Sequence, residues 1–184
     1  MTRSPALVLL IFAAACFEMM APTPSDVLTP VPAKIRGLWF DIAHLPHELQ
    51  ADCRDTATLL RETDDDSDLE FIFECRQPDE LWYNVTGKAS RHSDDPMLIE
   101  FEFENGLVDE AISLKYWIFD ADPDFSQWMV VAYPPENWLW VLSRNTTLDE
   151  AIVNESLSKL VSAGHFDQAM LDSKLETTEQ SYGN

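Results

Sequence analysis

The chain has 184 residues, and its 33 Asp and Glu against 12 Lys and Arg give a formal net charge of −21. This acidity argues against nucleic acid as a partner, because phosphate binding needs a basic face, and against electrostatic attachment to anionic lipid. With 46% hydrophobic residues the chain is too apolar for a disordered acidic protein, so we expect one folded domain with short tails.

The N-terminal segment has the pattern of an export signal. After Arg3, residues 6–15 form an uninterrupted apolar run, which is too short to span a membrane but suits the core of a signal peptide. The run ends in small residues directly before Cys16. Two processing routes fit: an ordinary signal peptidase that cuts after Ala15, or a lipoprotein signal peptidase that cuts the same bond and leaves Cys16 as a lipid anchor. Either route predicts a signal peptide over residues 1–15.

Residues 13–16 resemble a bacterial lipobox, with Ala13 where Leu is usual. We expect lipidation of Cys16, and because Phe17 rather than Asp follows, the pattern implies attachment to the periplasmic side of the cell outer membrane. The alternative is a soluble periplasmic or secreted protein. Residues 16–34 are rich in proline and lack periodicity, so they predict an extended tether between the anchor and the domain.

Cys53 and Cys75 remain as a pair once Cys16 is set aside. They lie equally far from residue 64, within the acidic run at residues 63–68. A hairpin that turns there would place the two cysteines opposite each other, close enough for a disulfide in an oxidising compartment. We expect this bond to stabilise the fold by about 3 kcal/mol in the chain-entropy model.

From residue 37 onward, short apolar segments alternate with turn residues. In residues 97–104, Ile99, Phe101 and Phe103 alternate with glutamates, as in a strand with one face in a core and the other in water. Similar patterns predict eight strands, at residues 37–43, 52–61, 69–76, 81–90, 97–104, 112–120, 126–133 and 138–144. Connections rich in Asp, Asn, Gly and Pro separate them, which indicates an antiparallel meander or barrel.

One helix is expected after the strands. Thr146 or Thr147 can cap its start, apolar residues between Leu148 and Val161 recur near a period of 3.6, and Gly164 ends it. The residues after it, 176–184, are expected to form a frayed tail.

Five short motifs and the cysteine pair occur in a recognisable order along the chain. The motifs are residues 37–47 (GLWFDIAHLPH), 85–89 (VTGKA), 122–125 (DPDF), 139–144 (LWVLSR) and 164–167 (GHFD). In this order they resemble bacterial outer-membrane lipoprotein lipocalins of the apolipoprotein D-like group, many of which place a disulfide where Cys53 and Cys75 stand. The resemblance implies an all-β fold over residues 35–175: an eight-stranded antiparallel up-and-down lipocalin barrel with one C-terminal α-helix packed outside.

The resemblance also assigns structural roles to four signature residues: Gly37, Trp39, Asp122 and Arg144. It places Trp39 at the closed end of the barrel beneath Arg144, where a guanidinium over an indole contributes roughly 0.5–2 kcal/mol. The chain departs from the family pattern at His44, which replaces an arginine, so we expect an altered buried polar network. Asp120 stands where the family usually has an apolar residue, and the sequence offers no account of it.

For function, the resemblance implies binding or transport of a fatty acid or lysophospholipid in the bacterial envelope, by a monomer or homodimer. The aromatic and aliphatic faces of the strands supply the candidate cavity residues: Phe71, Phe73, Ile99, Phe101, Phe103, Tyr116, Trp128, Tyr133, Trp138 and Trp140. Two alternatives remain open. One is a structural envelope lipoprotein whose barrel is filled by its own aromatics, and the other is a lipocalin-type enzyme with Cys53 unpaired.

We expect no catalytic residue, cofactor or metal site. His44, His47 and Cys53 lie across a proline-containing corner without a second pair of ligands, so structural histidines are the simpler interpretation. The acidic residues at 120–124 imitate the start of a calcium loop, but Phe125 stands at the required glycine and Val131 at the final acid.

Overall fold

The computed structural model describes residues 34–51, 53–63, 68–79, 81–92, 95, 97–104, 114–178, 180 and 181. The predicted signal peptide (1–15), Cys16 and the tether up to residue 33 lie outside the described residues. Within the described part of the chain, none of the helices has the length and apolar character that a membrane span needs.

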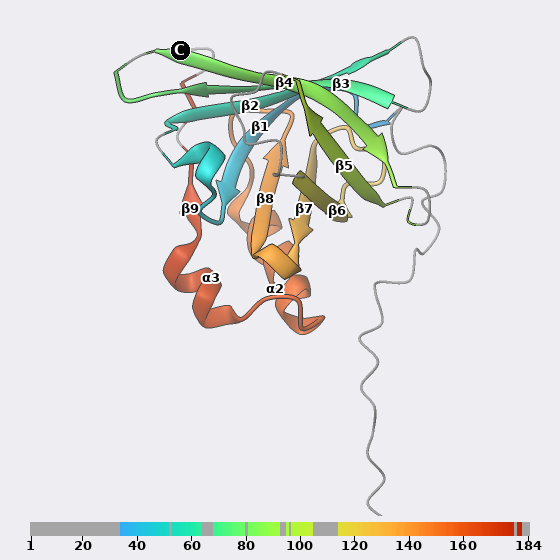
Figure 1. The fold of residues 1–184 in the computed structure, drawn as a ribbon. Helices are drawn as coiled ribbons and strands as arrows, with labels where there is room; N and C mark the ends of the chain where they lie inside the picture. Colours follow the sequence, from blue (N-terminus) through green and yellow to red (C-terminus); the bar gives the residue numbers. More distant parts are fainter. Residues whose placement is uncertain are drawn as a thin grey trace, which may run out of the picture.

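Eight strands follow one another around a closed sheet (Figure 1). They are β1 (Gly37–His44), β2 (Asp55–Glu62), β3 (Asp68–Arg76), β4 (Trp82–Arg91), β5 (Leu98–Phe103), β6 (Leu114–Ala121), β7 (Trp128–Tyr133) and β8 (Trp138–Ser143). Each pairs antiparallel with the next, and β1 pairs with both β2 and β8, which closes the barrel. The predicted eight-stranded antiparallel up-and-down barrel is confirmed. Two short 3-10 helices, η1 (Glu48–Gln50) and η2 (Pro134–Glu136), lie in the connections.

The C-terminal region holds two helices where one was expected: α2 (Glu150–Ser162) and α3 (Gln168–Lys174). Asp149 caps α2 by accepting a hydrogen bond from the Ala151 N–H at 2.8 Å, so neither predicted threonine is the cap. Asp167 caps α3 in the same way. A helix of seven residues is too short to display a periodic apolar stripe, which is why the sequence pattern missed it.

The described residues after α3, at 176–178, 180 and 181, are bonded to the barrel, so this part of the expected frayed tail was wrongly predicted. Strand β9 (Glu176–Thr177) pairs antiparallel with β1, and the Thr178 N–H donates to the Ile42 carbonyl at 3.0 Å. Further along, the Gln180 amide donates to the Asp41 carbonyl at 2.5 Å. The free edge of β1 beyond its pairing with β2 supplies these backbone partners, a tertiary effect that local sequence does not encode.

Two hydrophobic cores lie on the two faces of the sheet. The inner core lies inside the barrel and includes Trp39, Phe71, Phe101 and Tyr116. The outer core lies between the sheet and the C-terminal helices, and its members include Val130, Ala132, Leu139, Val141, Leu157, Leu160 and Phe166. Because β7 and β8 are covered on both faces, their sequences are nearly continuous apolar runs rather than alternating ones.

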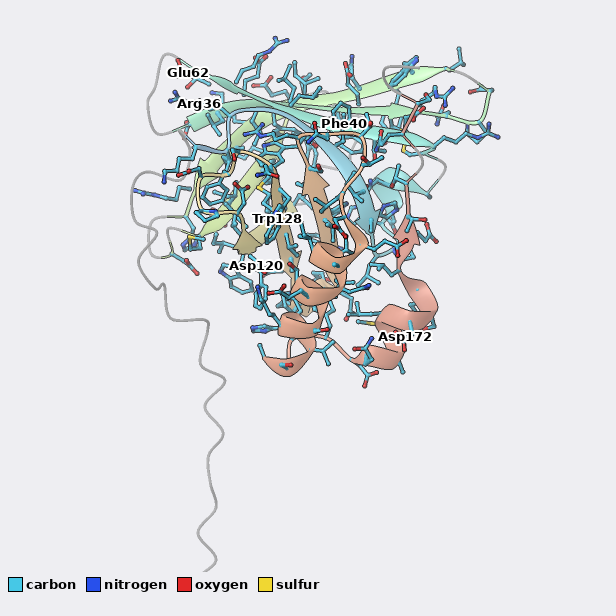
Figure 2. All side chains as sticks on the ribbon, turned by 180° about the vertical axis from the view of Figure 1, so that it is seen from behind. Arg36, Phe40, Glu62, Asp120, Trp128 and Asp172 are labelled. Carbon is cyan, nitrogen blue, oxygen red and sulfur yellow. A yellow bond between two sulfur atoms is a disulfide. The ribbon has the colours of Figure 1, made fainter. Side chains whose placement is uncertain are left out.

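Asp120 has a structural account on the outer face. A bulge in β6 between Ile118 and Asp120 shifts the register against β7. Asp120 then accepts hydrogen bonds from Ser156 at 2.9 Å and from the Lys159 ammonium at 3.0 Å, both on α2. Figure 2 shows Asp120 beside this helix. The charge at this position therefore joins the helix to the barrel.

The closed end of the barrel is built around Trp39, which is 0% exposed. Its indole N–H donates to the Ile35 carbonyl at 2.6 Å, and the Arg144 guanidinium carbon lies 3.5 Å from the ring centroid. Arg144 also donates to the carbonyls of Leu38 at 2.9 Å and Phe125 at 3.3 Å. Gly37 has φ +97°, and a Cβ there would lie 3.0 Å from the Arg144 side chain.

Asp122 organises the turn that supports Arg144. Its carboxylate accepts hydrogen bonds from the backbone N–H groups of Ser126, Gln127 and Trp128 at 2.9–3.1 Å and from the Ser126 hydroxyl. Burial alone would raise the pKa of Asp122, but these hydrogen bonds to the charged form hold it below its ordinary value. The four predicted signature residues thus belong to one structural unit at the closed end.

Removing a side chain from the outer core tests how strongly α2 is held. Leu160 is 0% exposed, so Leu160→Ala is expected to lower the free energy of unfolding by about 2–5 kcal/mol, through lost apolar burial and a residual cavity. Ser158→Ala, on the exposed side of the same helix, serves as the control and is expected to change it by less than about 0.5 kcal/mol. Urea denaturation measures both, and equal small effects would show that α2 packs only loosely.

Candidate ligand-binding site

A cavity lies inside the barrel, and its walls are the inner faces of the strands together with Gln50 of η1. Its lining consists of Asp41, Gln50, Ala57, Thr58, Phe71, Phe73, Phe101, Phe103, Leu114, Tyr116, Val131, Trp140 and Leu142. Most of these side chains are aromatic or aliphatic. Asp41, Gln50 and Thr58 are the polar exceptions, and the sequence prediction did not include them. The free volume of this cavity is about 50 Å³.

A connected series of rings crosses this cavity. Phe71 meets Phe101 edge to face at 5.0 Å between ring centroids and Phe103 at 5.5 Å. Phe101 in turn lies 4.7 Å from Tyr116, whose ring is 6.0 Å from Trp140. Burial raises the pKa of the Tyr116 phenol above its ordinary value. The wall therefore offers an apolar ligand an aromatic surface.

Gly87 allows this arrangement on the neighbouring strand. A Cβ at residue 87 would lie 2.6 Å from the Phe71 ring and 1.9 Å from the Glu102 carbonyl oxygen. Only a residue without a side chain fits between β3 and β5 at this point. The glycine of the V-T-G-K-A motif is therefore needed for packing of the ring series.

Six of the ten predicted cavity residues line the cavity: Phe71, Phe73, Phe101, Phe103, Tyr116 and Trp140. Ile99 is buried in the inner core without reaching it, and Tyr133 and Trp138 pack at the edge of the same core. Trp128 was wrongly predicted, since its side chain packs in the outer core beside α2 (Figure 2). In β7 it is Val131 that lines the cavity. Successive residues of a strand point to opposite faces, so Trp128, three positions before Val131, faces outward.

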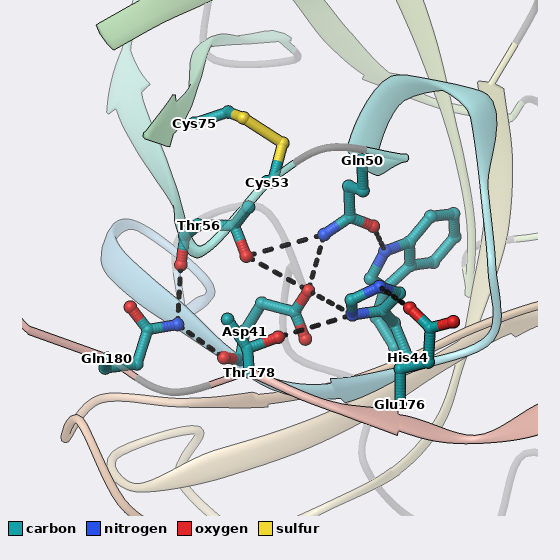
Figure 3. Close-up of polar contacts among 10 residues, drawn as sticks. Asp41, His44, Gln50, Cys53, Thr56, Cys75, Glu176, Thr178 and Gln180 are labelled. Atoms are coloured by element: carbon teal, nitrogen blue, oxygen red, sulfur yellow. Dashed lines mark hydrogen bonds and ion pairs between the residues drawn. A yellow bond between two sulfur atoms is a disulfide. The ribbon is translucent and has the colours of Figure 1, made fainter. Parts of the chain in front are cut away.

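A buried polar cluster consists of Asp41, His44, Gln50 and Thr56, and two of its members, Asp41 and Gln50, line the cavity. Figure 3 shows the contacts within this cluster. The Asp41 Oδ2 atom accepts hydrogen bonds from the Gln50 amide at 2.5 Å and from the Thr56 hydroxyl at 3.1 Å. The Gln50 carbonyl oxygen accepts from the Trp140 indole N–H. Gln50 belongs to η1, in the β1–β2 connection, so these bonds hold that connection against the barrel wall.

The disulfide fastens the same connection. Cys53 and Cys75 are bonded, with Cα atoms 5.4 Å apart, which confirms the predicted pair. The expected strand register was wrong, however, because Thr56 and not Cys53 lies opposite Cys75 in the β2–β3 ladder. Cys53 precedes β2, and its bond ties the end of the β1–β2 connection to the end of β3.

Comparison with known proteins places this architecture in a family. A family model described as a lipocalin-like domain matches residues 33–177. The chain belongs to this family. Among curated relatives, this lipocalin is 28% identical to temperature-induced lipocalin-1 of Arabidopsis thaliana over 158 residues, which cover 79% of this chain and 76% of that protein.

Solved structures show the same fold at lower identity. Insecticyanin from the tobacco hornworm Manduca sexta superimposes on the lipocalin with a TM-score of 0.64 at 17% identity, over 82% of this chain and 80% of that one. Lobster apocrustacyanin A1 matches with a TM-score of 0.62 at 14% identity, over 83% and 81% of the two chains. The likeness in these two cases concerns the fold.

His44, in the buried polar cluster, lies close to two acidic side chains. Its Nδ1 lies 2.9 Å from Asp41 Oδ2 and 3.3 Å from the Thr178 hydroxyl, and its Nε2 lies 3.7 Å from a Glu176 oxygen. Burial alone would lower the pKa of His44, but the hydrogen bond to Asp41 and the charges of Asp41 and Glu176 outweigh it, and the pKa is raised above 6.5. Among the described residues, His, Cys, Asp and Glu form no group of three or more that could hold a metal ion.

The raised pKa predicts how His44 contributes to stability as a function of pH. The folded state binds the proton more tightly than the unfolded state, so the contribution is fully present below the unfolded pKa of about 6.5 and is lost as pH rises through the folded pKa. His44→Gln is therefore expected to destabilise the protein more at acidic than at alkaline pH, as measured by urea denaturation across that range.

Asp41→Asn provides the matched background for this measurement. It removes the nearest of the acidic partners while leaving Glu176 and the fold of β9 in place. The pH-dependent part of the His44→Gln effect is expected to shrink in this background. A pH dependence of equal size in both backgrounds would show that Asp41 is not the group that raises the His44 pKa.

Proposed function

We propose that this lipocalin binds one small amphiphile reversibly, of the single-chain class that includes fatty acids and lysophospholipids, and carries it in the bacterial envelope. The observation that carries the proposal is the apolar, aromatic-lined cavity inside a closed eight-stranded barrel. An eight-stranded barrel is wide enough to hold one small ligand, and burial of an acyl chain contributes about 0.8 kcal/mol per methylene before ordering costs.

The proposed location is the periplasmic side of the outer membrane, with the protein anchored through lipid on Cys16. The support is the apolar run of residues 6–15 that ends at the cysteine, followed by the proline-rich residues 16–34. Several acyl chains on one residue would anchor the domain stably, and the tether would leave the barrel free to meet its ligand.

The anchor can be tested by metabolic labelling in a bacterial host. The parent protein is expected to incorporate labelled palmitate and to fractionate with membranes. Cys16→Ser is expected to lose both properties, and Cys53→Ser serves as the control that keeps them. An unlabelled parent protein in the soluble periplasmic fraction would favour the soluble alternative.

We further propose that the protein is a carrier rather than an enzyme. The enzymatic alternative required an unpaired Cys53, whereas Cys53 is bonded to Cys75. The described lining of the cavity consists mainly of apolar side chains, which suit partition of a ligand more than acid–base or nucleophilic chemistry.

A structural role with a self-filled barrel is the second candidate. The series of ring contacts from Phe71 to Trp140 and the small free volume, about 50 Å³, favour it specifically. Under that function the rings would be the permanent filling of the barrel, and no external molecule would be retained.

Native mass spectrometry separates the two functions. The Cys16→Ser chain, purified in a soluble form, would be measured before and after delipidation and then titrated with lysophospholipids and fatty acids. A co-purified lipid that is lost on extraction and rebinds one to one is the expected result. A protein that is bare from the start and binds neither class would contradict the carrier function and favour the self-filled barrel. The same spectra report whether the protein is a monomer or homodimer.

A further inference from the structure

Asp41 belongs to the cavity wall, and one of its carboxylate oxygens has no hydrogen-bond partner among the described residues. Asp41 is 3% exposed and lines the cavity. Its Oδ2 atom is surrounded by donors, with the Gln50 amide at 2.5 Å, the Thr56 hydroxyl at 3.1 Å and His44 Nδ1 at 2.9 Å. Its Oδ1 atom is buried and meets no hydrogen-bond donor among the described residues. A buried acceptor left in this state costs free energy, and a ligand that supplies a donor recovers it.

The Gln50 side chain, which lies beside Asp41, has no spare N–H group to donate to a ligand. The Gln50 amide nitrogen donates to Asp41 and, at 3.4 Å, to Thr56, while its carbonyl oxygen accepts from Trp140. A ligand carboxylate placed beside this cluster would therefore face another carboxylate and would find the Gln50 amide already engaged. Like charges at short range repel in a low-dielectric site, and the His44 ring beside Asp41 is already engaged by Asp41 Oδ2 and by Glu176.

We propose that Asp41 Oδ1 accepts a hydrogen bond from a hydroxyl or ammonium group on the ligand, so that the barrel prefers amphiphiles with a donor over free fatty-acid anions. This inference rests on the proposed carrier function and narrows it to a ligand class. A monoacyl lipid with a free hydroxyl, a long-chain alcohol or an amine-bearing lysophospholipid meets the requirement. The apolar chain lies among the rings, and the donor group lies at Asp41.

A matched ligand series tests the inference with every cavity residue unchanged. Dodecanol, dodecyl methyl ether and dodecanoate share one chain and differ at the polar end: donor and acceptor, acceptor alone, and carboxylate. Each would be titrated into the delipidated Cys16→Ser chain, with binding followed by calorimetry. Dodecanol is expected to bind about tenfold or more tightly than either of the others, because only it pairs with Oδ1. Equal binding of all three, or a preference for dodecanoate, would overturn the inference.

Asp41→Asn assigns the preference to this residue. The neutral amide removes the repulsion and can itself donate, so dodecanoate is expected to bind more tightly and the preference for dodecanol to fall by about tenfold. Asp124→Asn, which makes the same charge change in an exposed turn, is the control and is expected to keep the parent preference. An unchanged preference in folded Asp41→Asn protein would also overturn the inference.

The outcomes separate the inference from the function on which it rests. If dodecanol, dodecanoate and lysophospholipids all fail to bind the parent chain, the carrier function itself fails. If they bind without discrimination, the carrier function stands and the role of Asp41 is refuted.

Discussion

The double pairing of β1 is the constraint on which the rest of the structure depends. This strand hydrogen-bonds to β2 along its first half and to β8 along its second half, so it converts an open sheet into a closed barrel. The overlap at Phe40, which has a partner on each side, marks the seam. Closure leaves only a short free edge at the end of β1 and gives the strands an interior, without which neither the Trp39 plug nor the cavity would exist.

A bulge in β1 then decides what faces that interior. The register against β8 shifts between Asp41 and Ala43. In a regular strand, residues 41 and 44 would point to opposite faces, yet His44 Nδ1 lies 2.9 Å from the Asp41 carboxylate. The extra residue re-aims the end of the strand, as bulges commonly do near sites. The buried polar cluster is thus a product of the bulge as much as of the residue types.

Regular strands and known motifs could be predicted from the sequence, whereas irregular features such as this bulge could not. Strands with one wet face, such as β5, were recognisable from alternation alone, and the signature residues of the closed end were recognisable from their motifs. Asp41 and Gln50 were not, because the first depends on an irregular register and the second reaches the cavity from a connection. Trp128 failed for a related reason: β7 is apolar on both faces, so its composition does not reveal which side chains face inward.

The β2–β3 hairpin shows a similar limit. The cysteines were paired correctly although the register derived from their midpoint was wrong, since Cys53 reaches Cys75 from outside the ladder. A disulfide needs only suitable Cα separation, and a connection satisfies that as readily as a strand does. The second helix and β9 required knowledge of where the free edge of β1 lies, which is a property of the assembled barrel.

The closed end of the barrel is held by hydrogen bonds between side chains and backbone, whereas the polar cluster at the cavity is held by hydrogen bonds between side chains. This difference separates the residues that fix the fold from those that set ligand specificity. At the closed end, Arg144 donates to backbone carbonyls, and Asp122 accepts mainly from backbone N–H groups. These partners exist whatever side chains the surrounding positions carry. At the cavity, Asp41, Gln50 and Thr56 bond mostly to one another through side chains. A substitution there changes the polar character of the cavity while leaving the backbone bonds of the barrel intact, so the same fold can serve different ligands.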